Sequence, residues 1–462
     1  MTIAEELAKR VVTTRYEDLT QRAIEYAKIG VLDTFGVGIA GSVDEAAVIA
    51  RRVSGTEAGA ALVWGTPERT GALRAAFLNG IAANVLDYDD CTDNLGGHPS
   101  SPVLPALIAL AEQRHASGRD LLTAYVAGFE VETNLGRGVN FHHYEKGWHP
   151  TATLGVFGTA AACARLLQLN EAQTTRALAL CASLAAGVKS NLGSMAKPMH
   201  VGNSSRSGLL AALLAADGFT GNADALEHPQ GFLQVFNGAG TYSIERILEK
   251  WGTPWEIEMP GIAIKQYPCC LSTQSAIDLM IGLVKEHDVR ADAVAGVDAR
   301  VPALRLEHTN RPQPRSALDA KLSIQYVLAR ALSNRAVSLP HFEGDAYQDA
   351  NIQRAMKLVD AQPFDEPMLN ELGASGAVIV LRLKDGRQLA GKIRRPIGHE
   401  PGVPLPSDLV KAKFQVCVSR RLSPKQMADL YDSVQEFERV ADVRRFTACF
   451  EAAQAAPVRL AG

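Results

Sequence analysis

The feature that most constrains this chain is a succession of segments with helical apolar periodicity between residues 3 and 248. Apolar residues recur at steps of three and four, which places them on one face of an α-helix. Residues 155–167 (GVFGTAAACARLL) are apolar nearly all round, as is typical of a buried helix. The many small residues favour close helix–helix packing over a two-layer α/β fold. The clearest segments are residues 25–36, 104–112, 121–129, 155–167 and 174–184.

The pattern changes near Gly261. Residues 261–267 and 294–301 alternate like strands, and a helical segment over 273–286 lies between them. Residues 377–383 and 388–393, joined by a turn that contains Asp385-Gly386, predict a β-hairpin. After a Pro-rich loop at 401–406, helical periodicity returns over 424–437 and 440–452.

We therefore expect a mainly α fold with two domains. Both chain ends, residues 1–265 and 401–462, build a large all-helical domain. A smaller α+β domain, residues 266–400, is inserted into it.

Bulk properties narrow the functional classes. The formal net charge is −3 and no block of Lys and Arg stands out, so nucleic acid is not an expected partner. No apolar run reaches the roughly 18 residues that a membrane span needs. Residues 1–15 mix Glu and Lys and lack the apolar core of a signal peptide. We expect a cytoplasmic protein, with the matrix of a eukaryotic organelle as the alternative.

The chain has seven cysteines and no Cys-x-x-Cys pair. The odd number and the apolar surroundings of most of them predict reduced, buried thiols rather than a disulfide framework or a zinc ribbon. They are Cys91, Cys163, Cys181, Cys269, Cys270, Cys417 and Cys449.

Residues 36–41 (GVGIAG) match the spacing of a dinucleotide-binding loop. That motif needs a strand before it and a helix after it, whereas a helical run precedes it in this chain. Packing of small residues between helices is therefore the better interpretation.

An acidic motif follows the helical run that ends near residue 86. Asp87, Asp89 and Asp90 lie within four positions, and His98 follows. Neighbouring carboxylates raise one another's pKa, which suits acid–base chemistry. Two alternatives stay open: a divalent-cation site formed by the carboxylates and the His, and a helix end with solvated acids.

Two further motifs stand at predicted helix starts. His149, in GWHPT, begins an apolar helix, where free backbone N–H groups attract anions. Lys197, His200 and Ser204 begin another, a combination that suits a carboxylate or a phosphate. The alternatives are a structural His and an ordinary helix cap.

Lys265, in KQYPCC, lies at the predicted domain junction, where ligand sites concentrate. The adjacent Cys269 and Cys270 favour a buried thiol pair, with a nucleophile or a strained disulfide as the alternatives. The chain has no G-x-S-x-G, P-loop or H-E-x-x-H motif, so hydrolase, nucleotide and zinc-protease functions lack support.

Taken together, five motifs resemble the MmgE/PrpD family, and they cover most of the chain in order. They are LDTFGVGIAG (32–41), LDYDD with HPS (86–100), GWHPTATLG (147–155), KPMHVGNSSRSGLLAALLA (197–215) and KQYPCC (265–270). The resemblance implies a homodimer with a large helical domain and a smaller α+β lid domain. It also implies catalysis without a metal or an organic cofactor.

The resemblance also implies a set of site residues. The expected catalytic residues are Asp87, His98, His149, Lys197, Lys265 and Tyr326. We expect substrate contacts from Cys91, His200, Ser204 and Gln274. Three features depart from the family pattern. Cys91 replaces the usual Thr, the spacing to His98 is one residue longer, and Gln274 stands where many relatives carry His.

The activity implied by the resemblance is proton transfer at a carbon next to a carboxylate. His149 or His98 would be the base, since imidazole titrates near working pH, and the lysines would hold carboxylates. We expect a cofactor-independent hydro-lyase of the 2-methylcitrate dehydratase type, acting on a small di- or tricarboxylate. The alternatives are an epimerase of an iminodisuccinate-like substrate, a cis-aconitate-type decarboxylase and, from another class, a non-catalytic polycarboxylate-binding protein.

Overall fold

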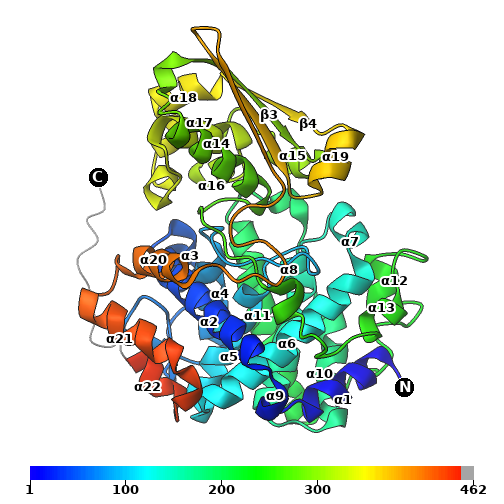
Figure 1. Cartoon of the computed structure of the whole chain (residues 1–462). Coiled ribbons are helices and arrows are strands. Elements are labelled where there is room, and N and C mark those ends of the chain that lie inside the picture. The colour runs from blue at the N-terminus through cyan, green and yellow to red at the C-terminus, as the bar shows by residue number, and fades with distance from the viewer. Residues whose placement is uncertain (449–462) are drawn as a thin grey trace. The chain divides into compact units, whose positions relative to one another are not determined.

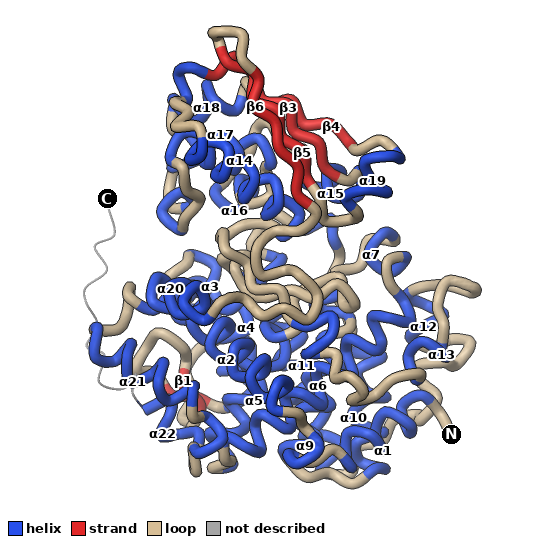
Figure 2. Tube along the Cα trace, in the orientation of Figure 1, coloured by secondary structure: helices blue, strands red, loops and turns tan. Residues whose placement is uncertain are grey.

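The computed structural model describes residues 1–448. The fold is mainly α, as the periodicity predicts, with two small sheets among the described residues (Figure 2). Two compact units make up the chain. Unit 1 comprises Met1–Ile264 and the segment that begins at Pro406, and unit 2 comprises Lys265–Leu405.

Unit 1 is a helical assembly in which α2, α4, α5, α6, α9 and α11 bury most of their residues. Its longer helices are α1 (Ile3–Thr13), α2 (Gln21–Gly41), α3 (Glu45–Val53), α4 (Ala72–Asn84), α5 (Ser100–Arg114), α6 (Gly118–Val139), α9 (Gly155–Leu166), α10 (Glu171–Leu184), α11 (Ala196–Ala216), α20 (Ser407–Val418) and α21 (Pro424–Gln435). Shorter elements are α7 (His142–Glu145), α8 (Pro150–Thr153), α12 (Phe232–Phe236), α13 (Ile244–Leu248), α22 (Val443–Thr447), β1 (Ala61–Leu62) and β2 (Arg69–Thr70).

The GVGIAG motif is part of helix α2, so the helix-packing interpretation is confirmed. A Cβ atom on Gly38 would lie 2.4 Å from the ring of Trp64, and one on Gly41 would lie 2.1 Å from the carbonyl oxygen of Ala82. No side chain fits at either position without movement of its neighbours.

Helices α4 and α11 cross with their backbones almost in contact. A Cβ on Gly80 of α4 would lie 2.8 Å from the Cα of Gly202 in α11. Conversely, a Cβ on Gly202 would lie 2.4 Å from the carbonyl oxygen of Phe77. Glycine at both positions thus fixes how closely α11 approaches its neighbour.

The two chain ends meet at α2, where α20 and α21 pack (Figure 1). The Lys28 ammonium donates to the carbonyl oxygen of Gln435, at 2.6 Å. The buried Lys413 of α20 pairs with the buried Asp33 of α2 at 2.6 Å and donates to the carbonyl oxygen of Tyr88 at 2.7 Å. The C-terminal segment therefore anchors the loop that carries the acidic motif.

Unit 2 is built on a four-stranded sheet in the order β4-β3-β5-β6 (Figure 2). Strand β3 (Val294–Val301) is parallel to β4 (Val359–Pro363) and antiparallel to β5 (Ala377–Leu383), which pairs with β6 (Gln388–Ile393). Helices α14 (Gln274–Glu286) and α17 (Ile324–Asn334) share one hydrophobic core with the sheet. The smaller helices are α15 (Ala303–Thr309), α16 (Ala317–Ala320), α18 (Ala350–Met356) and α19 (Glu366–Leu372).

The hairpin, strand 294–301 and helix 273–286 are confirmed within one residue. The strand predicted at 261–267 is wrong. Pro260 and the positive φ of Gly261 (89°) interrupt an extended course, and the segment keeps only an isolated bridge between Ala263 and Cys91. Strand β4 was not predicted. The helix predicted at 440–452 is α22 in part, and its end lies outside the described residues.

The cysteines that the structure describes are free thiols, as predicted. Cys270 is half-buried and the others are buried, while Cys449 lies outside the described residues. Within residues 1–448, no helix combines the length and the apolar character that crossing a bilayer would require.

Candidate active site

The acidic motif forms a buried loop directly after α4. Asp87 has φ 52°, in the left-handed region, where Asp is among the few non-glycine residues that are tolerated. Its backbone N–H donates to the carbonyl oxygen of Asn84 at 2.9 Å. Such a conformation costs on the order of 1 kcal/mol and is common at functional sites. The turn sets the position of the Asp87 carboxylate.

His98 lies among the oxygen atoms of this loop. Its Nε2 is 3.5 Å from the Asp87 carboxylate, and its Nδ1 is 3.2 Å from Asp89 and 3.0 Å from the carbonyl oxygen of Asp90. The thiol of Cys91 lies 3.6 Å from the same Nδ1. These contacts on both sides of the ring fix its orientation.

Asp90 supports the loop from behind. Its carboxylate accepts hydrogen bonds from the backbone N–H and the hydroxyl of Ser100, and that hydroxyl also contacts the hydroxyl of Tyr125. Burial and the nearby charge of Asp33 raise the pKa of Asp90 to about 7. Asp90 is therefore a buried acid that gains or loses its proton near neutral pH.

His149 lies in a different electrostatic environment. It precedes α8, and its backbone N–H donates to the carbonyl oxygen of Gly187 at 3.0 Å. Its ring is buried, with Nδ1 3.4 Å from Nδ1 of His200. Burial and the charge of Lys197 hold the pKa of His149 well below its ordinary value. Burial and Lys197 also lower the pKa of His200. At neutral pH, His149 is therefore a neutral imidazole.

Helix α11 joins these two environments. Lys197, His200 and Ser204 are spaced three and four residues apart, so they share one face of the helix. The Lys197 ammonium lies 2.8 Å from the Asp87 carboxylate, with 12% and 8% of the two side chains exposed. The Ser204 hydroxyl is buried and has no hydrogen-bond partner among the described residues. A buried hydroxyl without a partner is costly, which favours a ligand for it.

The structure thus brings six predicted residues of unit 1 together. His149 is coupled electrostatically to Lys197, His200, His98 and Asp87, so the two histidine environments belong to one site. Ser204 lies on α11 one helical turn beyond His200. The catalytic roles of these residues stay predictions. The six residues are Asp87, Cys91, His98, His149, Lys197 and His200.

Asp87, Asp89 and His98 offer donor atoms within 4.8 Å of one another, so they could hold a metal ion. The Lys197 ammonium competes for one of these donors, because it lies 2.8 Å from Asp87 Oδ1. A divalent cation at that oxygen would have to displace Lys197 or tolerate its positive charge.

The other three predicted residues belong to unit 2. Lys265 is fully buried at the first position of the unit. The Gln274 side chain is engaged with the backbone of the KQYPCC loop: it accepts from the Tyr267 N–H at 3.2 Å and donates to the Tyr267 and Cys269 carbonyl oxygens at 3.0 and 3.2 Å. In this arrangement Gln274 stabilises the loop.

Tyr326 is buried in unit 2. Its hydroxyl donates to the carbonyl oxygen of His341 and accepts from Nε of Arg330, at 3.0 Å in the second case. Burial raises the pKa of Tyr326. The hydroxyl would have to exchange one of these bonds to serve as a proton donor to a substrate.

The sequence-based set of site residues omitted Asp89 and Asp90, which hold the His98 ring. The clustering of three carboxylates was the available signal. The sequence gives no sign of the Ser100 and Tyr125 hydroxyls behind Asp90, since they come from α5 and α6.

Comparisons with known proteins agree with these motifs. The MmgE/PrpD N-terminal domain matches residues 5–245, and the MmgE/PrpD C-terminal domain matches residues 267–437. The cis-aconitate decarboxylase of Homo sapiens is 31% identical over 459 residues, 95% of this chain and 92% of that protein. The Mus musculus protein of that name is 29% identical, with 95% and 91% coverage, and the Aspergillus terreus protein is 27% identical, with 83% and 82% coverage. Family and relatives support an enzyme, and the chain belongs to the MmgE/PrpD family.

Proposed function

We propose that this protein is a lyase that removes carbon dioxide from a tricarboxylate of the cis-aconitate type. The observation that carries the proposal is the buried cluster of unit 1, in which the charge of Lys197 acts on the neutral His149. The substrate is suggested by the relatives, three of which are named cis-aconitate decarboxylase. The dehydratase that we expected from the sequence becomes the second candidate.

The cluster offers what a polycarboxylate needs. Lys197 supplies a cation whose side chain is only 12% exposed, and its attraction for a carboxylate is stronger there than at the surface. The Ser204 hydroxyl on the same helix face supplies a donor that has no described partner. Asp87 holds the ammonium in place at 2.8 Å before the substrate arrives, so little reorganisation is required.

The chemical step breaks a carbon–carbon bond and consumes one proton. The electron pair of the bond to the leaving carboxylate stays on carbon, carbon dioxide departs, and the carbanion takes up a proton. Charges of the remaining carboxylates disfavour that carbanion, so a cation close to them lowers the barrier. The proton reaches the carbon from solvent through His149 or His98.

The depressed pKa of His149 in the free protein is compatible with this step, because the negative charge of a bound substrate would change that pKa. In the free protein Lys197 and burial keep the ring neutral. A bound tricarboxylate brings negative charge to the site, which raises the pKa of the ring and lets it take up the proton that the carbanion then receives. Binding of the substrate would thereby promote protonation of His149, the proposed proton donor.

A hydro-lyase is the second candidate because the same neutral His149 can accept a proton. Abstraction next to a carboxylate, followed by loss of a β-hydroxyl, would use the imidazole as a base. An acid must then protonate the leaving hydroxyl, and His98, which lies among carboxylates, could supply that proton.

The test is an NMR assay in deuterated water with cis-aconitate, citrate, methylcitrate and iminodisuccinate offered separately. We expect cis-aconitate to be consumed, carbon dioxide to be released and one deuterium to appear in the product. Dehydration of citrate or methylcitrate would favour the second candidate, and epimerisation of iminodisuccinate would favour an isomerase. Binding without turnover or exchange would support a pocket without catalysis.

Substitution of His149 tests whether the activity depends on the buried cluster. His149→Gln should lower turnover by about 100-fold or more, because it removes a group that carries a proton. His228→Gln is the matched control, since His228 is exposed in unit 1. If His149→Gln keeps the wild-type rate with an unchanged melting temperature, the proposed site is wrong.

A further inference from the structure

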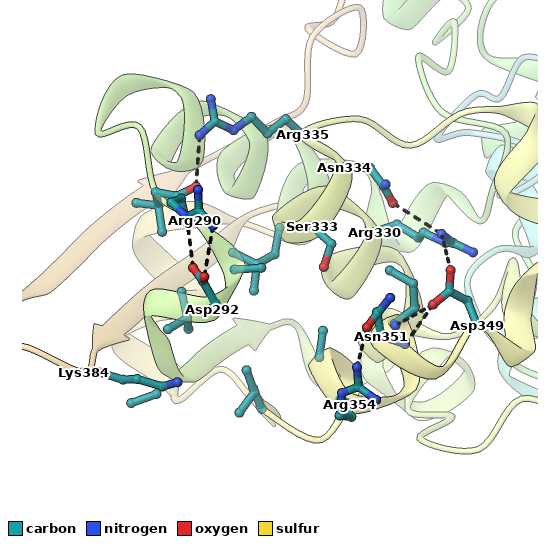
Figure 3. A pocket seen from close by; sticks show the side chains of 18 residues that line it. Arg290, Asp292, Arg330, Ser333, Asn334, Arg335, Asp349, Asn351, Arg354 and Lys384 are labelled. Carbon is teal, nitrogen blue, oxygen red and sulfur yellow. Dashed lines mark hydrogen bonds and ion pairs between the residues drawn. The ribbon is translucent and has the colours of Figure 1, made fainter.

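Unit 2 contains a large pocket that the proposed chemistry does not use. It lies between the C-terminal end of α17, the start of β3 and helix α18, and its volume is about 1000 Å³ (Figure 3). All of its lining residues belong to unit 2. The volume is at the upper end of the range for small-molecule sites.

Positive charge dominates the lining. Two carboxylates, Asp292 and Asp349, face five basic side chains that approach the pocket from different sides in Figure 3. Because the excess charge surrounds one hollow, the pocket attracts an anion with several charges. The basic residues are Arg290, Arg330, Arg335, Arg354 and Lys384.

Nearby carboxylates neutralise only part of this charge. Arg290 pairs with Asp292 at 3.1 Å, and Arg335 pairs with Asp288. Arg354 donates to the uncharged side-chain oxygen of Asn351. Across residues 1–448, no ion pair within 4.0 Å involves Arg354 or Lys384.

Arg330 gives the pocket a preorganised cation. Only 7% of its side chain is exposed, and its Nη1 lies 4.0 Å from Asp349, which is too far for a hydrogen bond. Its Nε donates to the Tyr326 hydroxyl at 3.0 Å and its Nη2 to the carbonyl oxygen of Ala346 at 2.6 Å. These bonds hold the guanidinium in place, so little entropy is lost when it meets an anion.

Part of the lining is apolar. Leu358 is half-buried and Ala295 is exposed, so both can contact a ligand, whereas Val289, Val294 and Ile352 are buried in the core of unit 2. Apolar atoms beside several cations fit a ligand with an organic part and a charged part.

We propose that this pocket binds an organic phosphate of nucleoside-phosphate size. Arginine forks match phosphate oxygens in geometry and charge. The base of a nucleoside phosphate would cover the apolar atoms of Ala295 and Leu358, which a bare inorganic anion would leave exposed. A tricarboxylate would fill only a small part of the volume, so the substrate class proposed for unit 1 is the weaker fit.

Calorimetry of the full-length protein tests the proposal with three probes: magnesium-free ATP, adenosine and inorganic triphosphate. We expect ATP to bind and its affinity to fall as salt rises, because charged groups supply much of the attraction. Adenosine should not bind measurably, and triphosphate should bind at least about tenfold more weakly than ATP, since it lacks the ring. Failure of ATP to bind, or equal affinity for triphosphate, would overturn the proposal.

Two double variants with the same charge change locate the binding. Arg354→Ala with Lys384→Ala should weaken ATP binding at least tenfold, because each removes a charged contact. The control is Arg382→Ala with Arg387→Ala, which removes two exposed cations of unit 2 that lie outside the pocket. If both pairs weaken ATP binding equally, the binding depends only on the overall charge of the protein, and the pocket is not the binding site. A thermal melt of each variant shows whether the fold is retained.

Discussion

The two histidine environments of the candidate site differ in the charge that surrounds each ring. His98 lies against Asp87 and Asp89, whereas the ring of His149 lies against His200 and is coupled electrostatically to Lys197. Burial together with a positive neighbour keeps the His149 imidazole neutral, whereas His98 has carboxylates on two sides of its ring. One site therefore holds two rings of the same residue type in environments of opposite charge.

This difference supports the proposal that the two rings take different parts in proton transfer. The separation depends on Lys197, since its ammonium both touches Asp87 and lowers the pKa of His149. A single charge thus acts on both rings. The predictions below test that arrangement.

Lys197→Ala should have the largest effect. It removes the cation for the substrate and leaves the Asp87 carboxylate without its partner at 2.8 Å, so we expect turnover to fall about 100-fold or more. Steady-state kinetics with the substrate found by the NMR assay measures this. Lys9→Ala, an exposed position on α1, is the control. If the turnover rate of the variant stays within threefold of wild type, Lys197 has no essential role in the reaction.

Asp89→Asn tests the His98 side alone. The substitution keeps the size of the side chain but removes the charge 3.2 Å from the ring, so the ring loses its fixed orientation. We expect a roughly 10- to 100-fold loss of kcat, with KM changed little. If only KM rises, the role of Asp89 is in binding the substrate and not in positioning the ring.

Ser204→Ala tests the α11 face near His149. The hydroxyl has no described partner in the free protein, so its loss should not destabilise the fold. We expect KM to rise severalfold and kcat to change little, because the hydroxyl would contribute one hydrogen bond to the bound substrate. An unchanged KM would show that Ser204 does not contact the substrate.

Asp90→Asn should have the smallest effect of the four substitutions. We expect the effect in how the melting temperature depends on pH. The folded-state pKa of Asp90 is about 7, above its value in an unfolded chain, so wild type loses stability as the pH rises from about 4 through 7. The Asn variant lacks that loss. Its melting temperature relative to wild type should therefore increase by a few degrees across this window. A difference that stays constant with pH would contradict the assignment.

Local patterns predicted most of the fold. Helices such as α9 and α10 follow from periodicity, and the hairpin follows from alternation around Asp385-Gly386. Strand β4 escaped prediction because its short segment, Val359–Pro363, has only one buried residue. The segment 261–267 alternates in sequence, but Pro260 and Gly261 give it another course.

The site was predictable to the extent that its residues lie in short motifs. Lys197, His200 and Ser204 could be placed together because one helix spaces them. The partners of Asp90 could not, since Ser100 and Tyr125 come from helices that meet only in the folded chain. The hydrogen bond from Arg330 to Tyr326 joins residues four positions apart on one helix. That Arg330 also lines a pocket follows only from the folded structure of unit 2.

The contact between Gly80 and Gly202 limits how this site can evolve. Because the two backbones nearly touch, any larger residue at Gly202 would push α11 away and carry Lys197, His200 and Ser204 with it. Substitutions at that crossing therefore cannot move one of these three side chains without moving the other two. New substrate preferences in descendants or in engineered libraries should arise instead from loops such as 91–97 and 185–195, where backbone changes leave the helix crossing intact.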